Sequence, residues 1–149
     1  MMKTIIVYET KNGTTKVLAE YIGDEIRAAG FDVDIVNISH VKRYEPLNTY
    51  NAFIFGTATV VGNMMPGMKA FLSDVPKADL NGKIGGAFGT FGCCGKGPQD
   101  IFLEMNKTLH MDMIAGPLIL KTYQPAEIMR TGHQYGREIV KKLKTFKPE

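Results

Sequence analysis

A cluster of hydrogen-bonding side chains follows the first apolar run of the chain. The cluster consists of Thr10, Asn12, Gly13, Thr14 and Thr15, and a stretch of helical periodicity begins directly after it. A helix N-terminus has unpaired N–H groups and about half a positive charge, so hydroxyl donors beside it favour an anion. Gly13 allows close approach because it has no Cβ. The spacing predicts a phosphate-binding loop, and the alternative is a helix capped by Thr14 or Thr15.

This loop matches neither of two common nucleotide-binding motifs. It lacks the Gly-x-x-x-x-Gly-Lys sequence of Walker loops, and Lys11 is its one cation. It also lacks Gly-x-Gly-x-x-Gly, which disfavours a dinucleotide-binding fold. The ligand is therefore expected to have a phosphate without being a nucleoside triphosphate or a dinucleotide.

Two later loops are also rich in glycine and threonine. Segments 57–63 and 89–95 each follow a run that is apolar enough for a central parallel strand. Neither these loops nor the first one contains a histidine or a carboxylate, so we expect no catalytic acid or base and no metal ligands. A bound cofactor would have to supply the chemistry.

The apolar periodicity predicts an α/β fold in which strands and helices alternate. Strands are expected at 4–8, 33–38, 52–56, 83–89 and 113–120, with a long turn at 57–65 and a helix that starts at Pro98. Such alternation predicts a five-stranded parallel sheet in the order 2-1-3-4-5, covered by helices on both faces. Ligands bind at the carboxyl ends of such strands, which is where the three loops would meet.

Composition favours a single domain spanning residues 1–149. The net charge is +3, from 18 basic and 15 acidic residues, and no basic patch with interleaved aromatics indicates nucleic acid. The adjacent Cys93 and Cys94 do not suit a disulfide framework. No leader or membrane-spanning run is recognisable, so we expect a soluble, cytoplasmic monomer with no membrane partner.

The loop signature resembles a known family. The sequence Val7-Tyr8-x-Thr10-x-x-Gly13-x-Thr15-x-x-x-Ala19-x-x-Ile22 is similar to the flavodoxin motif, in which this loop holds the phosphate of FMN. Further similarity to the flavodoxin domain of A-type flavoproteins is found at Phe55-Gly56-Thr57-x-Thr59, Met64-Met65-Pro66, Ala70-Phe71-Leu72 and 86–92. Those proteins also have a diiron domain, and we expect none in this chain because its 149 residues are accounted for by the flavodoxin-like domain. The resemblance is to a free-standing, short-chain flavodoxin.

The resemblance implies a flavodoxin-like three-layer sandwich that binds FMN. The phosphate would lie on the first loop, and the flavin ring would lie between the second and third loops. The candidate cofactor-binding residues are Thr10, Lys11, Asn12, Gly13, Thr14, Thr15, Thr57, Ala58, Thr59, Val60, Val61, Asn63, Gly89, Thr90, Phe91, Gly92, Cys93, Cys94 and Gly95.

Two departures from the family bear on the flavin. The family places a tryptophan or tyrosine against the ring, whereas this chain has Cys93 and the pair Val60-Val61 there, so we expect weaker FMN binding. The two cysteines could form a redox or thiol-adduct site, or serve as small residues beside the ring. Lys11 and Lys96 also replace the usual acidic surroundings. This charge predicts a less negative second reduction potential and a partner with an acidic docking face.

The implied function is electron transfer between redox partner enzymes, by one or two electrons carried on FMN. Two alternatives stay open. One is a small FMN-dependent NAD(P)H or quinone-type reductase. The other is an FMN-poor, flavodoxin-like binding module that regulates a partner.

Overall fold

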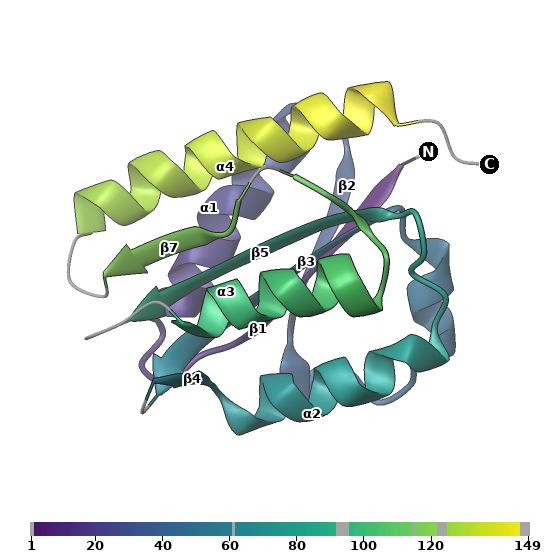
Figure 1. The fold of residues 1–149 in the computed structure, drawn as a ribbon. Coiled ribbons are helices and arrows are strands. Elements are labelled where there is room, and N and C mark those ends of the chain that lie inside the picture. Colours follow the sequence, from purple (N-terminus) through teal and green to yellow (C-terminus); the bar gives the residue numbers. More distant parts are fainter. Residues whose placement is uncertain (1, 61, 92–95, 115, 122–124, 147–149) are drawn as a thin grey trace.

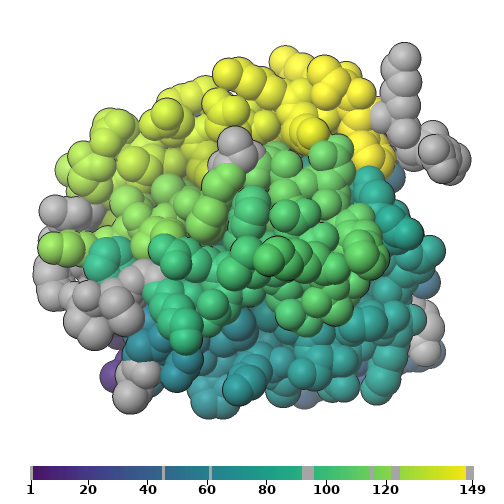
Figure 2. All heavy atoms as spheres, in the orientation of Figure 1, coloured from purple at the N-terminus to yellow at the C-terminus, as the bar shows by residue number. Residues whose placement is uncertain are grey.

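The fold is a three-layer α/β sandwich (Figure 1). The computed structural model describes residues 2–60, 62–91, 96–114, 116–121 and 125–146. Helices α1 (Thr14–Ala28) and α4 (Pro125–Thr145) cover one face of the sheet. Helices α2 (Pro66–Asp74) and α3 (Lys96–Leu103) cover the other face. In the space-filling view, the side chains of α2, α3 and α4 hide most of the sheet (Figure 2).

The sheet is parallel along its main path, and the amino-terminal strand is the second strand from one edge. The order is β2-β1-β3-β5-β6, and β4 and β7 pair with β3 and β5 respectively. The strands are β1 (Lys3–Glu9), β2 (Asp32–Asn37), β3 (Ala52–Val60), β4 (Asn63–Met64), β5 (Ile84–Phe91), β6 (Asp112–Met113) and β7 (Leu118–Lys121). The predicted doubly wound α/β class is confirmed. The predicted order of the first four strands is also confirmed, since it corresponds to β2-β1-β3-β5.

The expected fifth strand at 113–120 is wrong as a single element. It consists of two short segments, β6 and β7, which both pair with β5, so the sheet has seven strands. Gly116 has a φ of 62° and Pro117 has no N–H group, so an extended strand cannot continue through them. The break leaves part of β5 without a strand neighbour on that side.

The side chain of Tyr135 in α4 forms hydrogen bonds to β5 at the position of this break. Its hydroxyl donates to the carbonyl oxygen of Ala87 at 3.0 Å and accepts from the Ala87 N–H at 3.0 Å. Ala87 lies in β5 between the residues paired with β6 and those paired with β7. One phenol therefore satisfies both backbone groups that the interrupted strand leaves unpaired.

Two strands extend further than predicted. The segment 57–60 continues β3, and β4 returns antiparallel to it, with Val60 opposite Asn63. The long turn expected at 57–65 is therefore wrong, because most of it forms a hairpin. Strand β5 likewise runs on to Phe91. Glycine and threonine content indicated a loop here, but pairing between neighbouring strands overrides this local tendency.

The helix boundaries agree with the sequence at α2 and differ at α3. Pro66 is the first residue of α2, whereas α3 begins at Lys96, two residues before the predicted start at Pro98. Proline is tolerated in the first turn because no intrahelical acceptor exists for its missing N–H. Helix α3 continues into a π-helical turn, η4 (Glu104–Thr108). Short 3₁₀ turns occur at η1 (Ile38–His40), η2 (Glu45–Thr49) and η3 (Val75–Lys77).

Strand periodicity divides the core into two halves. In β1, Ile6 and Tyr8 face α1 and α4, while Ile5 and Val7 face α2 and α3. This follows from the alternation of side chains along a strand. On the α2 side the core is aromatic, and the Phe55 and Phe71 rings meet edge to face with centroids 5.0 Å apart.

Candidate functional site

The three predicted loops begin next to one another at the carboxyl edge of the sheet. In the strand register, Glu9 of β1 lies opposite Thr57 of β3, and Thr57 lies opposite Gly89 of β5. Ala58 is paired with Thr90 one residue further along. Parallel strands end at the same edge, so the segments that follow them converge. The structure thus brings together the first loop and the starts of the second and third.

The N-terminus of α1 is left uncapped by side chains. Gly13 is the N-cap residue, with a φ of 92°, and neither a side-chain cap nor an acidic residue occurs in the first turn. The alternative in which Thr14 or Thr15 caps the helix is therefore wrong. A Cβ built on Gly13 would meet no atom within 4 Å apart from its chain neighbours, so the space beside this residue is open. Apart from the Thr14 N–H, which donates to the Asn12 side chain, the N–H groups of the first turn and the positive end of the helix dipole are available to an anion.

Hydrogen bonds within the first loop fix its shape. The Thr10 hydroxyl oxygen accepts from the Gly13 N–H at 2.9 Å, and the Asn12 side-chain oxygen accepts from the Thr14 N–H at 3.3 Å. As an acceptor in this bond, the Thr10 hydroxyl keeps its own proton for another partner. Lys11 at the tip is exposed. The loop is preorganised, with donors and one cation on its open side.

Thr15 is the one loop residue that is fully buried. Its hydroxyl oxygen lies 2.9 Å from the hydroxyl oxygen of Thr90 at the end of β5, and both residues have no exposed surface. This hydrogen bond joins the start of α1 to the start of the third loop. Sequence spacing gave no sign of it, since the residues are 75 positions apart.

The threonines of the second loop have structural partners. The Thr57 hydroxyl donates to the Ala58 carbonyl at 2.8 Å and accepts from the Met65 N–H at 3.1 Å. The Thr59 hydroxyl accepts from the Gly97 N–H, at the start of α3, at 3.1 Å. These hydroxyls hold the β3–β4 hairpin against α2 and α3. Val60 and Asn63 form the base of the hairpin tip.

The third loop is described only at its beginning. Gly89 and Thr90 are buried and Phe91 is half-buried, all within β5. The predicted site residues Val61, Gly92, Cys93, Cys94 and Gly95 lie outside the described residues. The expectations for the two cysteines stay predictions.

Charges near the site are more balanced than the sequence indicated. The Lys96 ammonium lies 4.0 Å from a carboxylate oxygen of Asp100, and side-chain exposure is 59% for the lysine. Glu9, directly before the first loop, accepts from the Met68 N–H of α2 at 2.7 Å. The cationic character expected from Lys11 and Lys96 is thus partly offset.

Glu9 is a residue that sequence reasoning missed. Its carboxylate lies at the N-terminus of α2, where negative charge is favourable, although α2 begins 57 residues later. The signal in the sequence was Gly67, a glycine directly after Pro66 in the first turn of α2. In the structure, a Cβ at this position would collide with the Glu9 carboxylate. A glycine in the first turn of a helix costs stability unless close packing requires it.

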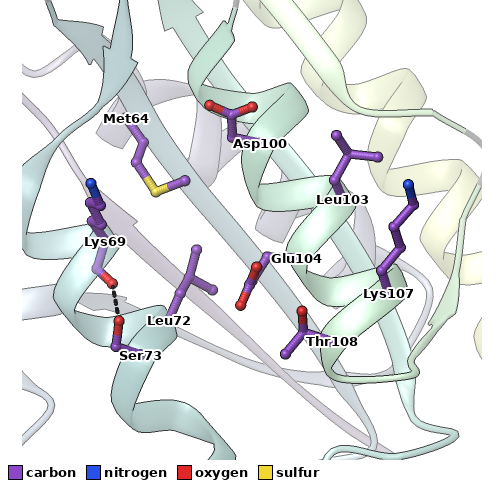
Figure 3. A pocket seen from close by; sticks show the side chains of 9 residues that line it. All are labelled: Met64, Lys69, Leu72, Ser73, Asp100, Leu103, Glu104, Lys107 and Thr108. Carbon is purple, nitrogen blue, oxygen red and sulfur yellow. Dashed lines mark hydrogen bonds between the residues drawn. The ribbon is translucent and has the colours of Figure 1, made fainter.

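Two hollows lie near the carboxyl edge or along the α2–α3 face. One, of about 340 Å³, adjoins the first loop and is lined by Asn12, Gly13, Thr14, Val17, Tyr21, Pro125 and Ile128. The other, of about 440 Å³, lies between α2 and α3, and its lining includes Lys69, Glu104 and Lys107 (Figure 3). The second contains no predicted site residue.

The described part of the chain contains neither a candidate metal cluster nor a helix that could span a membrane. Within it, no group of three or more His, Cys, Asp or Glu side chains could hold a metal ion. The same residues include no helix with the length and hydropathy needed to cross a membrane.

Comparison with known proteins identifies the family. The family model described as Flavodoxin matches residues 6–113, which include all three predicted loops. The chain belongs to the flavodoxin family. A solved flavodoxin from the domain Archaea shares 28% sequence identity with a TM-score of 0.90, covering 96% of this chain and 99% of that one.

Curated relatives include larger redox proteins. A nitric oxide reductase of Moorella thermoacetica is 26% identical over 145 residues, covering 95% of this chain, and the chain spans only 36% of its length. An NAD(P)H dehydrogenase (quinone) of Rhodopseudomonas palustris (strain TIE-1) is 30% identical over 139 residues, covering 76% of this chain and 69% of the relative. This flavodoxin-family chain is therefore similar both to free-standing flavodoxins and to parts of longer proteins.

The site of this flavodoxin-family chain fits the phosphate end of a flavin nucleotide. The uncapped α1 N-terminus, the open space at Gly13 and the free proton of Thr10 form a donor-rich cradle without a nearby acidic side chain on the helix. An anion at this point would satisfy N–H groups that no side chain caps. Of the residues predicted to flank the ring, the structure describes Val60 at the end of β3, Asn63 in β4 and Phe91 at the end of β5.

Proposed function

We propose that this chain is an FMN-binding electron-transfer protein that shuttles one or two electrons between redox partner enzymes. The observation that carries the proposal is the uncapped N-terminus of α1, with its open glycine and hydroxyl-rich loop at the carboxyl edge of the sheet. The family membership supports a flavin as the ligand. FMN would supply the redox chemistry when bound.

The residues of the chain would then bind and shield the cofactor. The first loop would hold the phosphate through N–H groups and the hydroxyls of Thr10 and Thr14, with Lys11 adding a positive charge. The hairpin at Val60 and the end of β5 at Phe91 would flank the ring and limit its contact with water. The three predicted loops contain no histidine or carboxylate, which suits a carrier better than an enzyme with an acid or base.

A second candidate function is an FMN-dependent NAD(P)H or quinone-type reductase. The similarity to the NAD(P)H dehydrogenase (quinone) of Rhodopseudomonas palustris favours it. Such a reductase would need room for a nicotinamide and a quinone beside the flavin. The two candidates differ in whether a nicotinamide alone can reduce the bound flavin.

Reconstitution with FMN tests the proposal. The purified chain is titrated with FMN, and the visible spectrum is recorded during anaerobic photoreduction and, separately, after addition of NADH or NADPH. We expect stoichiometric FMN uptake, reduction in two separate one-electron stages, and no bleaching by the nicotinamides. Bleaching by a nicotinamide alone would favour the reductase. A chain that takes up no FMN would contradict both and support the binding module.

A further inference from the structure

The buried hydroxyl pair of Thr15 and Thr90 has an unusual position for a structural hydrogen bond. Thr15 lies in the first turn of α1, beside the open phosphate cradle, whereas Thr90 ends β5, which is not a neighbour of β1 in the sheet. Both residues have 0% exposure, so water does not serve either hydroxyl from the surface. The pair therefore depends on partners inside the protein or on a ligand.

One hydroxyl proton of the pair has no acceptor within the described residues. Two hydroxyls carry two protons, and the single 2.9 Å contact between their oxygens uses one of them. Neither hydroxyl has another hydrogen-bond acceptor in the part of the chain that the structure describes. A buried hydroxyl proton without an acceptor is costly, so a further acceptor beside this pair would stabilise it.

We propose that Thr90 is a positioning residue for the cofactor phosphate. Its hydroxyl donates to the Thr15 oxygen, and this directs the Thr15 proton toward a phosphate oxygen at the N-terminus of α1. The direction of donation follows from position, because Thr15 is the member of the pair on the helix that faces the anion. The inference rests on the proposed function, and it adds a residue outside the phosphate loop to phosphate recognition.

The arrangement has a mechanical consequence as well. The bond ties the start of the third loop to the phosphate loop, so phosphate binding would also fix the end of β5 next to the ring. Hydrogen bonds in a chain strengthen one another, because each donor polarises the next. Thr90 would therefore contribute to the affinity for FMN without touching it.

Comparing FMN with riboflavin isolates the effect, because riboflavin lacks the phosphate. Dissociation constants for both flavins are measured by fluorescence quenching for the wild type, Thr90→Val and Thr90→Ser. We expect Thr90→Val to weaken FMN binding about fivefold, equivalent to about 1 kcal/mol. Its riboflavin affinity should change less than twofold, and Thr90→Ser should restore FMN affinity. Equal loss for both flavins, or no loss for FMN, would overturn the proposal.

A double-mutant cycle tests whether the effect passes through Thr15. In a Thr15→Val background, Thr90→Val should cause no further loss of FMN affinity, because the hydroxyl that it orients is gone. A persisting fivefold loss would contradict the positioning role. Thr4→Val is the matched control. Thr4 is as buried as Thr90, but it lies near the start of β1, at the opposite end of that strand from the first loop. It should leave both affinities unchanged.

Three further outcomes are distinguishable. If the Thr90→Val protein does not fold, as judged by circular dichroism, Thr90→Ala is measured against Thr90→Ser in the same way. If the wild type binds neither flavin, the proposed function fails and the role of Thr90 fails with it. If the wild type binds FMN and the Thr90 variants discriminate no better than Thr4→Val, only the role of Thr90 fails.

Discussion

At the scale of single residues, the Tyr135 side chain provides hydrogen bonds to β5 that a neighbouring strand would otherwise make. Tyr135 is buried, and its hydroxyl bonds both the N–H and the carbonyl of Ala87, where β6 and β7 leave a break. Removing one partner from a buried hydrogen bond costs about 1–3 kcal/mol, because the remaining group is left desolvated. Here one substitution leaves two backbone groups without a partner.

Tyr135→Phe is therefore expected to lower the free energy of unfolding by at least about 2 kcal/mol. Urea denaturation followed by circular dichroism measures this change. Tyr21→Phe serves as the control, since the Tyr21 ring meets His133 edge to face and its hydroxyl has no hydrogen bond within the described residues. A loss for Tyr135→Phe no greater than that for Tyr21→Phe would contradict the bridging role.

The same tyrosine gives the protein a pH dependence. Burial raises the pKa of Tyr135 above the ordinary value of 10.0, because the phenolate loses its hydration. Above about pH 10 the unfolded chain releases this proton while the folded chain keeps it, so stability falls as pH rises. Parallel urea titrations at about pH 9 and about pH 11, on either side of the ordinary tyrosine pKa, measure this effect. Between these two pH values the wild type should lose more stability than Tyr135→Phe. Equal losses would show that Tyr135 does not contribute.

At Thr4, by contrast, removing the hydroxyl is expected to stabilise the protein. The Thr4 hydroxyl is fully buried in β1 and has no hydrogen-bond partner among the described residues. Valine has the same shape, and it removes the unsatisfied group while adding a buried methyl. Thr4→Val should therefore raise the free energy of unfolding by about 1 kcal/mol in urea denaturation. A destabilisation would mean that this hydroxyl has a partner after all.

At the scale of elements, α1 and α4 approach closely because α4 has glycines on its inner face. A Cβ on Gly136 would lie 2.8 Å from the Ile22 carbonyl oxygen and 2.6 Å from the Glu25 Cβ. An ion pair completes the contact, with an Arg137 nitrogen 3.2 Å from a carboxylate oxygen of the half-buried Glu25. Backbone cannot move aside as a side-chain end can, so the helices must separate if a methyl group is added.

Gly136→Ala tests this packing with an unambiguous sign. Alanine favours a helix over glycine by about 1 kcal/mol, so an open site would be stabilised. The close contacts predict instead a loss of about 1–3 kcal/mol in thermal or urea unfolding. Gln134→Ala on the exposed face of the same helix is the control, and it should change stability by less than about 0.5 kcal/mol. Stabilisation by Gly136→Ala would contradict the close approach.

The elements also show what the sequence could and could not predict. The apolar runs at β1, β3 and β5 and the helical periodicity of α1 are local patterns, and they predicted the layers and the positions of the loops. The hairpin after Thr57, the division of β6 from β7 and the pair Thr15–Thr90 all depend on contacts between distant segments. Such contacts leave no local pattern, and the segments 57–60 and 89–91, whose glycine and threonine content indicated loops, belong to paired strands.

At the scale of the whole molecule, charge is distributed unevenly around the proposed flavin site. The net charge is +3, but the nearby Lys96 is paired with Asp100, and Glu9 adds a carboxylate beneath the first loop. Lys11 is exposed and has no ion pair within the described residues. Lys11 is therefore the cation with the largest uncompensated effect on a flavin and on an acidic partner.

Lys11→Gln is accordingly expected to make the second one-electron potential of the bound flavin more negative. A unit charge ~8 Å away at an effective dielectric of ~20 is worth about 2 kcal/mol, or roughly 90 mV, and exposure to solvent reduces this to tens of millivolts. Lys96→Gln should shift the potential less, because Asp100 already offsets its charge. Lys144→Gln, near the C-terminal end of α4, is the control and should have no effect. Anaerobic potentiometric titration at low and high salt measures all three, and added salt should shrink the shifts. An equal or larger shift for Lys96→Gln would contradict this distribution of charge, and a very low second potential in the wild type would contradict the influence of the lysines altogether.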